Sequence, residues 1–212
     1  MLVFTTFFTA LMASAYYLTA KRVAKAELEE KLRLIGEVLP ASQYDNALLA
    51  DAVTLPPQEA LGLDADSRVW RARKDGIPVA LVLEAAAPDG YSGRIGLLLA
   101  VDVEGHLIAL RVTAHRETPG LGDYIDPKKD RNKERPWISQ FAHRGFDSTP
   151  PDRWRVRKDG GEFDQMSGAT ISARAVTNAS RNALEWAVER RKALFAAPTG
   201  SVYQESATAK QE

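Results

Sequence analysis

The chain has 212 residues, of which 45% are apolar, and its 28 basic residues balance 28 acidic ones. This length suits one domain with appendages, and a net charge of zero argues against a nucleic-acid-binding protein, which usually carries a basic excess. Because the chain has no cysteine, disulfides, thiolate metal sites and cysteine nucleophiles are excluded, while its three histidines are too scattered to indicate a metal site: His106, His115 and His143.

The first twenty residues, MLVFTTFFTALMASAYYLTA, carry no charged side chain. About twenty apolar residues span the hydrocarbon core of a bilayer, so residues 1–20 are expected to form a transmembrane anchor. A secretion signal is the alternative, with Ala13 and Ala15 as an A-x-A cleavage pattern, although the apolar run continues beyond them. A buried helix of a soluble protein is a third interpretation.

Residues 21–65 are expected to form a helical connector between this anchor and the main domain. Apolar residues recur among charged ones from 21 to 38, as in an amphipathic helix, and Pro40 ends the pattern. The stretch YDNALLADAV, at 44–53, predicts a second short helix. By the positive-inside rule, the basic residues that follow the apolar run would lie in the cytoplasm: Lys21, Arg22 and Lys25.

The main domain, expected at 66–195, begins with two predicted hairpins. The strands RVWRARKDG and IPVALVLEAA are joined at Asp75-Gly76, and RIGLLLAVDVEG and HLIALRVTAH are joined at Glu104-Gly105. Both dipeptides are strong signals for hairpin turns. These patterns predict an α+β fold in which an antiparallel sheet packs against a long C-terminal helix.

Between the hairpins and that helix, RPWISQF predicts a short helix and WRVRKDGGEFD a strand with a turn. The long helix is expected from Ile171 to about Phe195, where apolar residues recur at helical spacing. Residues 196–212 are polar, with Pro and Gly, and are predicted to be disordered.

Three short stretches stand out, and the local chemistry of each leaves two interpretations open. In GYSG, at 90–93, Tyr91 either stacks on an aromatic ligand or is an ordinary turn residue. In HRETPGLG, at 115–122, the Pro and Gly residues make either a common loop or a turn that lets the backbone approach a flat ligand closely.

The third stretch is DQMSGATISA, at 164–173, which precedes the long helix. Ser167 is either the N-cap of that helix or part of a phosphate site, since a helix N-terminus offers free amides and the positive end of a dipole. As a hydrolase nucleophile Ser167 is poorly placed, because it is not in a G-x-S-x-G elbow and no histidine lies near it in sequence.

Taken in order, these stretches resemble the G subunit of the Rnf electron-transport complex: VLPASQYDN, GYSG, HRETPGLG, WRVRKDGG and DQMSGATISARAV. The resemblance covers nearly the whole chain, from the apolar segment to the long helix. The C subunit of the sodium-pumping NADH:quinone reductase, which shares the flavin-binding domain, is the close alternative.

The resemblance implies a covalently bound FMN, attached through a phosphoester bond to Thr170. A separate flavin transferase makes this bond from FAD, and the residues that match its recognition motif are Asp164, Ser167, Gly168 and Ala169. The remaining residues expected to contact the flavin lie in the two upstream stretches: Tyr91, Glu117, Thr118, Gly120 and Leu121.

The resemblance also implies a place in the cell. The protein is expected to be a single-pass component of the bacterial inner membrane, with its FMN-binding domain on the periplasmic side and other membrane subunits as partners. It would relay electrons in a complex that links ferredoxin and NAD chemistry to ion movement, and would not be a complete enzyme alone. A flavin-binding sensor or assembly domain, and an anchored hydrolase using Ser167, are the alternatives.

Overall fold

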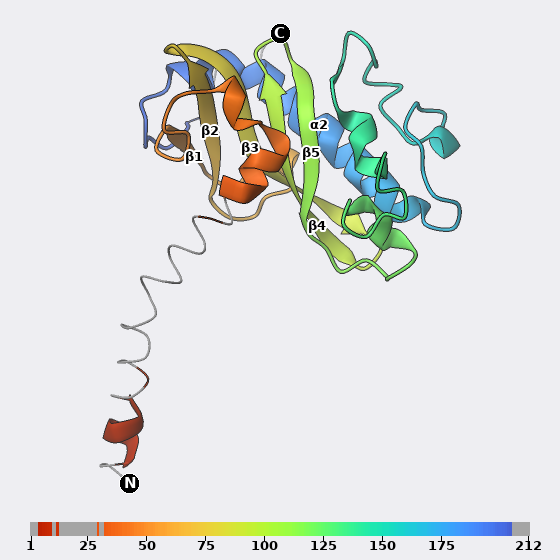
Figure 1. The fold of residues 1–212 in the computed structure, drawn as a ribbon, viewed down its shortest axis with the longest axis horizontal. Coiled ribbons are helices and arrows are strands. Elements are labelled where there is room, and N and C mark those ends of the chain that lie inside the picture. Colours follow the sequence, from red (N-terminus) through yellow and green to blue (C-terminus); the bar gives the residue numbers. More distant parts are fainter. Residues whose placement is uncertain (1–3, 10–11, 13–28, 30–31, 205–212) are drawn as a thin grey trace.

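The computed structural model describes residues 4–9, 12, 29 and 32–204 (Figure 1). Within these residues no helix is both long enough and apolar enough to cross a membrane. Most of the predicted anchor at 1–20, and the connector before residue 32 except Glu29, lie outside the described residues. The part of the connector that is described contains the expected helix, at 32–38.

Six antiparallel strands form one sheet in which each strand pairs with the next along the chain (Figure 1). The predicted hairpin at Asp75-Gly76 is confirmed, and GYSG forms a second tight turn in which Gly90 pairs with Gly93. The strands are β1 Ala52–Leu55, β2 Ser67–Lys74, β3 Ile77–Gly90, β4 Gly93–Asp102, β5 His106–Ala114 and β6 Arg144–Gly145.

The helix α2, Thr170–Ala196, packs across one face of the sheet (Figure 1), which confirms the predicted α+β architecture. Successive residues of β3 point to opposite faces, so Leu81 and Leu83 join the core beneath α2 while Val82 joins a smaller core on the other face. The helix at 32–38 packs on this second core. Because both faces of β3 are covered, its sequence is apolar almost throughout rather than alternating.

Five short 3₁₀ helices connect these elements within the described residues. They are η1 Ala41–Gln43, η2 Glu59–Leu61, η3 Gly122–Ile125, η4 Trp137–Phe141 and η5 Arg157–Asp159. The helix expected in RPWISQF is η4. The strand expected in WRVRKDGGEFD is wrong, because Gly160 reverses the chain after η5 and only an isolated bridge joins Val156 to Phe163.

At the edge of the sheet, the structure differs from two further expectations, for the stretch before β1 and for the segment after α2. The stretch at 44–53 is not a helix but a turn that leads into β1, whose Val53 and Leu55 are buried in the core. The segment after α2 is ordered as far as it is described, because it adds to the free edge of β1. Thr54 N donates to Ser201 O at 2.9 Å, and Tyr203 N donates to Thr54 O at 2.8 Å.

A buried guanidinium joins the C-terminal end of α2 to this edge. Arg71 Nη1 donates to Leu194 O at 3.0 Å and also to Ala197 O, and its Nε donates to Asp51 Oδ1 at 2.8 Å. Burial alone would raise the pKa of Asp51, but hydrogen bonds from Arg71 and Arg73 outweigh burial and lower that pKa below its ordinary value. The Asp51 carboxylate therefore stays charged opposite Arg71 at neutral pH.

Candidate functional site

A pocket of about 140 Å³ lies where the start of α2 meets the turn between β3 and β4 and the segment that follows β5. The three stretches singled out in the sequence therefore meet here, although Tyr91 and Gly168 are 77 positions apart in the chain. The pocket is lined by Tyr91, Glu117, Thr118, Leu121, Gly122, Gly168, Ala169, Ile171 and Ser172.

The rim of this pocket is unusually apolar for an exposed surface. Tyr91, Leu121 and Ile171 are 67%, 52% and 44% exposed, and each comes from a different part of the chain. Large apolar side chains that gather around one concave site in this way mark a surface that a ligand covers. Gly168 and Ala169, which also line the pocket, have little or no side chain to fill it. This combination suits a flat, largely apolar ligand.

A buried carboxyl holds the three stretches together behind the pocket. Glu117 Oε1 accepts a hydrogen bond from Ser92 N at 3.0 Å, and Glu117 Oε2 accepts one from Ser172 Oγ. Gly122 packs against this pair, and a Cβ at that position would meet Glu117 Oε2 at 2.7 Å. The close approach that requires glycine at 122 is therefore to the protein's own Glu117, whereas the sequence had suggested an approach to a ligand.

The helix α2 begins with its first amides uncapped by any side chain of the described residues. Ala169 occupies the N-cap position, so the expectation that Ser167 is the N-cap is wrong. Ser167 and Gly168 instead form an exposed bend in which Gly168 has a φ of 85°, a left-handed conformation that favours glycine. Uncapped amides and the positive end of a helix dipole form a site for an anion such as a phosphate.

Thr170 is the first residue of α2 and is half-buried. It does not line the pocket itself, but both of its neighbours, Ala169 and Ile171, do. Gly120 also lies outside the lining. It contributes its amide to the turn by donating to Asp123 Oδ1 at 2.9 Å.

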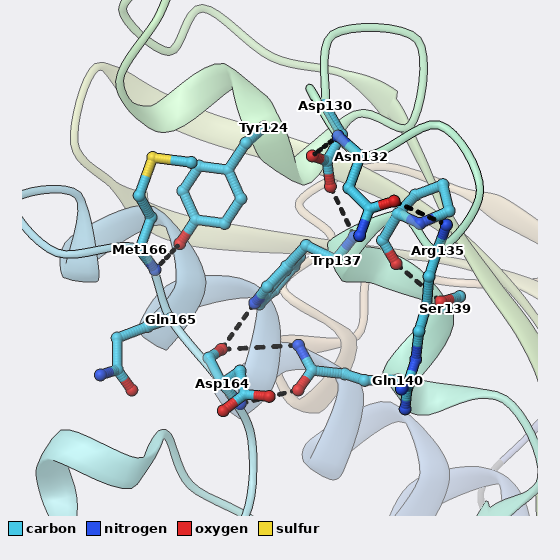
Figure 2. A pocket seen from close by; sticks show the side chains of 11 residues that line it. Tyr124, Asp130, Asn132, Arg135, Trp137, Ser139, Gln140, Asp164, Gln165 and Met166 are labelled. Carbon is cyan, nitrogen blue, oxygen red and sulfur yellow. Dashed lines mark hydrogen bonds between the residues drawn. The ribbon is translucent and has the colours of Figure 1, made fainter.

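The segment at 164–169 is held by side chains that the sequence had not indicated (Figure 2). Trp137 Nε1 donates to Asp164 O at 2.6 Å, and Asp164 N donates to Gln140 Oε1 at 2.7 Å. These residues border a second pocket, of about 380 Å³, between η4 and the segment. Asp164 thus lies in this second pocket, and its carboxylate pairs with Arg157 Nε at 3.1 Å.

Tyr124, on η3, holds the other end of the same segment. Its hydroxyl accepts a hydrogen bond from Met166 N at 3.1 Å and donates one to Ala169 O at 3.3 Å (Figure 2 shows the first). Burial raises the pKa of Tyr124 above its ordinary value, with Asp130 adding to the effect and the bond from Met166 opposing it. The hydroxyl therefore keeps the proton that it donates to Ala169.

Sequence reasoning missed Ile171 and Ser172 on the pocket, and Tyr124, Trp137 and Gln140 behind the segment. Of these, Ile171 had a signal in the sequence, because a large apolar residue in the first turn lies off the buried stripe of α2. The others are contacts between residues 24 to 55 positions apart along the chain, which no local pattern indicates.

Comparison with known proteins shows that the sequence around this pocket matches a known domain family. The FMN-binding domain family matches residues 90–185, a range that contains all three stretches around the pocket. The chain is 37% identical over 190 residues to the G subunit of the ion-translocating oxidoreductase complex of Shewanella baltica (strain OS223), covering 90% of this chain and 87% of that protein.

Two other relatives have the same name. The protein of Vibrio cholerae serotype O1 (strain M66-2) is 38% identical over 196 residues, covering 92% of this chain and 91% of the relative. The protein of Pseudomonas aeruginosa (strain UCBPP-PA14) is 41% identical over 186 residues, covering 88% of this chain and 85% of the relative. The likeness therefore extends well beyond the domain around the pocket.

Proposed function

Because the chain belongs to the family of G subunits of ion-translocating oxidoreductase complexes, we propose that it relays electrons within such a complex through an FMN held at the start of α2. The relatives favour this family over the alternative resemblance to the C subunit of the sodium-pumping reductase. As the resemblance implied, the complex would link ferredoxin and NAD chemistry to ion movement, and this chain would be one redox component of it.

The observation that carries this proposal is the meeting of three distant stretches at one pocket. The residues present fit FMN in both of its parts. The exposed side chains of Tyr91, Leu121 and Ile171 offer apolar contacts to a flat ring system, and the uncapped amides of α2 offer hydrogen bonds to a phosphate. FMN supplies the redox chemistry when bound, and the protein orients it and tunes its potential.

We further propose that the attachment is covalent and that Thr170 makes it. Thr170 Oγ1 would form a bond to the FMN phosphorus of FAD while the bond between the two phosphates breaks, so that AMP leaves and the hydroxyl proton passes to solvent. The resulting phosphodiester keeps one negative charge, which the N-terminus of α2 stabilises. A separate flavin transferase would catalyse this step. No acid–base pair of this chain is needed for electron passage itself.

Intact mass tests cofactor and attachment together. The full-length chain, purified from cells that contain the flavin transferase, should carry the added mass of one FMN group after denaturation. The same chain from cells without the transferase should have the mass of the polypeptide alone. An unmodified mass in both preparations would rule out covalent attachment.

The rim of the pocket predicts a spectroscopic change. Leu121→Gln should shift the absorbance maximum of the bound flavin while Thr170 is still modified, because a polar amide would replace an apolar contact to the ring. Ile77→Gln is the matched control, since Ile77, the first residue of β3, is also an exposed large apolar residue and does not line the pocket. Identical flavin spectra for the Leu121 variant and the wild type would remove this residue from the flavin site.

We also propose that residues 1–20 anchor the protein in the bacterial inner membrane, with the FMN-binding domain on the periplasmic side. The core of that domain is built from residues after 34, so it does not depend on the apolar run. A chain lacking residues 1–20 is expected to stay in the supernatant after ultracentrifugation and to unfold cooperatively. Aggregation of that chain under all conditions of expression would contradict an independent domain.

The two rival functions receive less support. For a hydrolase, Ser167 would need a histidine, and within the described residues no hydrogen bond joins Ser167 to one. A sensor or assembly role is less well supported, because the relatives are named as subunits of an oxidoreductase complex. Electron flux through the assembled complex distinguishes a sensor from an electron relay. Deleting a sensor would leave that flux intact, whereas deleting a relay would abolish it.

A further inference from the structure

Most of the hydrogen bonds that fix the segment leading into Thr170 are made to its main chain. Trp137 and Gln140 bind the carbonyl and amide of Asp164, and Tyr124 binds the amide of Met166 and the carbonyl of Ala169. The anchors therefore lie at both ends of the segment. The last one is the carbonyl immediately before Thr170.

This arrangement leaves the polar side chains of the segment at the surface. Asp164 pairs there with Arg157, and Gln165 Oε1 accepts a hydrogen bond from Lys158 N at 3.3 Å. The carboxylate of Asp164 is 64% exposed, and Ser167 and Gly168 are exposed at the bend. Of the anchoring side chains, Tyr124 is buried in the core and Trp137 packs against it. Trp137 packs edge-on against Tyr124, with ring centroids 5.4 Å apart, and against Phe141 at the same distance, and Asp130 accepts a hydrogen bond from Trp137 N at 2.5 Å.

A segment that is held by its main chain and exposes part of its surface, here at Asp164, Ser167 and Gly168, is suited to recognition by another protein. Preorganisation of such a surface lowers the entropy lost on binding. The groove of about 380 Å³ beside the segment would admit a loop of that partner next to Asp164, Gln165 and Met166 (Figure 2).

We propose that Tyr124, Trp137 and Gln140 are positioning residues for flavin attachment, which hold segment 164–169 in the conformation that the flavin transferase recognises. This inference rests on the proposed modification of Thr170. In the step that they assist, Thr170 Oγ1 bonds to the FMN phosphorus of FAD, AMP leaves with the electrons of the broken phosphate bond, and the proton is released. None of the three residues touches the reacting atoms.

The test compares two conservative variants with a matched control. Tyr124→Phe removes both contacts of the hydroxyl and keeps the ring, while Trp137→Phe removes the bond to Asp164 O. The control is Trp154→Phe, which removes the bond from Trp154 Nε1 to Ser180 Oγ, at 3.0 Å, and keeps an aromatic ring against Phe163; this bond involves no residue of the segment. Each full-length protein is purified without FMN and then incubated with purified transferase and FAD well below its unfolding temperature.

The rate of covalent flavin appearance is followed by fluorescence in denaturing gels as the concentration of acceptor protein is varied. For Tyr124→Phe, kcat/KM should fall roughly tenfold, mainly through a higher KM, because two hydrogen bonds of ordinary strength no longer order the segment. Amide hydrogen exchange of residues 164–170 should become faster in both variants before any flavin is added. Trp154→Phe should lower the unfolding temperature but leave both kcat/KM and the amide exchange of residues 164–170 as in the wild type.

The outcomes separate this inference from the proposed function. If the wild-type chain takes up no FMN, the proposed modification is wrong and the positioning role with it. If the wild type is modified and both variants match its kcat/KM and its exchange, the inference alone is overturned. It is also overturned if Trp154→Phe slows attachment as much as Tyr124→Phe, because loss of stability would then account for the effect.

Discussion

Thr170→Ala should fold normally and lose covalent FMN entirely. The half-buried side chain of Thr170 lies in the first turn of α2, and alanine is a better helix former, so the change in unfolding free energy should stay within about 0.5 kcal/mol. The hydroxyl of Ser172, which also lines the pocket, is buried and donates to Glu117, so it is not available to form the phosphoester in place of Thr170. In-gel flavin fluorescence after denaturation, from cells that contain the transferase, measures the loss.

Ser167→Ala is the matched control, because it removes the exposed hydroxyl of the same segment. Since Ser167 is exposed and does not cap α2, this change should also cost less than about 0.5 kcal/mol, and attachment should persist. Mass spectrometry of the peptide that spans 164–174 locates the adduct. Covalent FMN retained in Thr170→Ala, or an adduct on Ser167, would show that the assignment of Thr170 is wrong.

Arg71→Ala should lower the free energy of unfolding by about 3–5 kcal/mol, which is the usual cost of removing one partner of a buried ion pair. Three kinds of acceptor each lose a donor at once: the Asp51 carboxylate, which keeps only its contacts from other residues such as Arg73, the carbonyls at the end of α2, including Leu194 O, and Thr199 Oγ1. Urea unfolding followed by tryptophan fluorescence measures the change.

An exposed pair provides the comparison. Arg94 Nη1 lies 2.8 Å from Asp64 Oδ2, but the Asp64 side chain is 92% exposed, so Arg94→Ala should cost less than about 1 kcal/mol. Equal losses of stability in the two variants would contradict the special importance of the buried guanidinium. Because Arg71 lies at the far end of α2 from Thr170, the Arg71 variant should still accept FMN wherever it remains folded.

Much of the fold was predictable because local signals and tertiary contacts agree. Asp75-Gly76 favours a tight hairpin by its own backbone preferences, and the long helix follows from the spacing of its apolar residues. The predictions failed where a distant partner overrides local preference. The helix-like stretch at 44–53 leads into β1, because the edge of β2 offers ladder hydrogen bonds and the core accepts Val53 and Leu55.

The sequence by itself determined the antiparallel sheet, the long helix, the three stretches around the site and the family to which they belong, because each depends on residues adjacent in the chain. Only the tertiary structure decided that Glu117 binds Ser92 and Ser172, that Tyr124 and Trp137 hold the segment before Thr170, and that Ser167 is not the helix cap. Such contacts join residues that are distant in sequence, and they form only when packing of the sheet against α2 brings those residues within hydrogen-bonding distance.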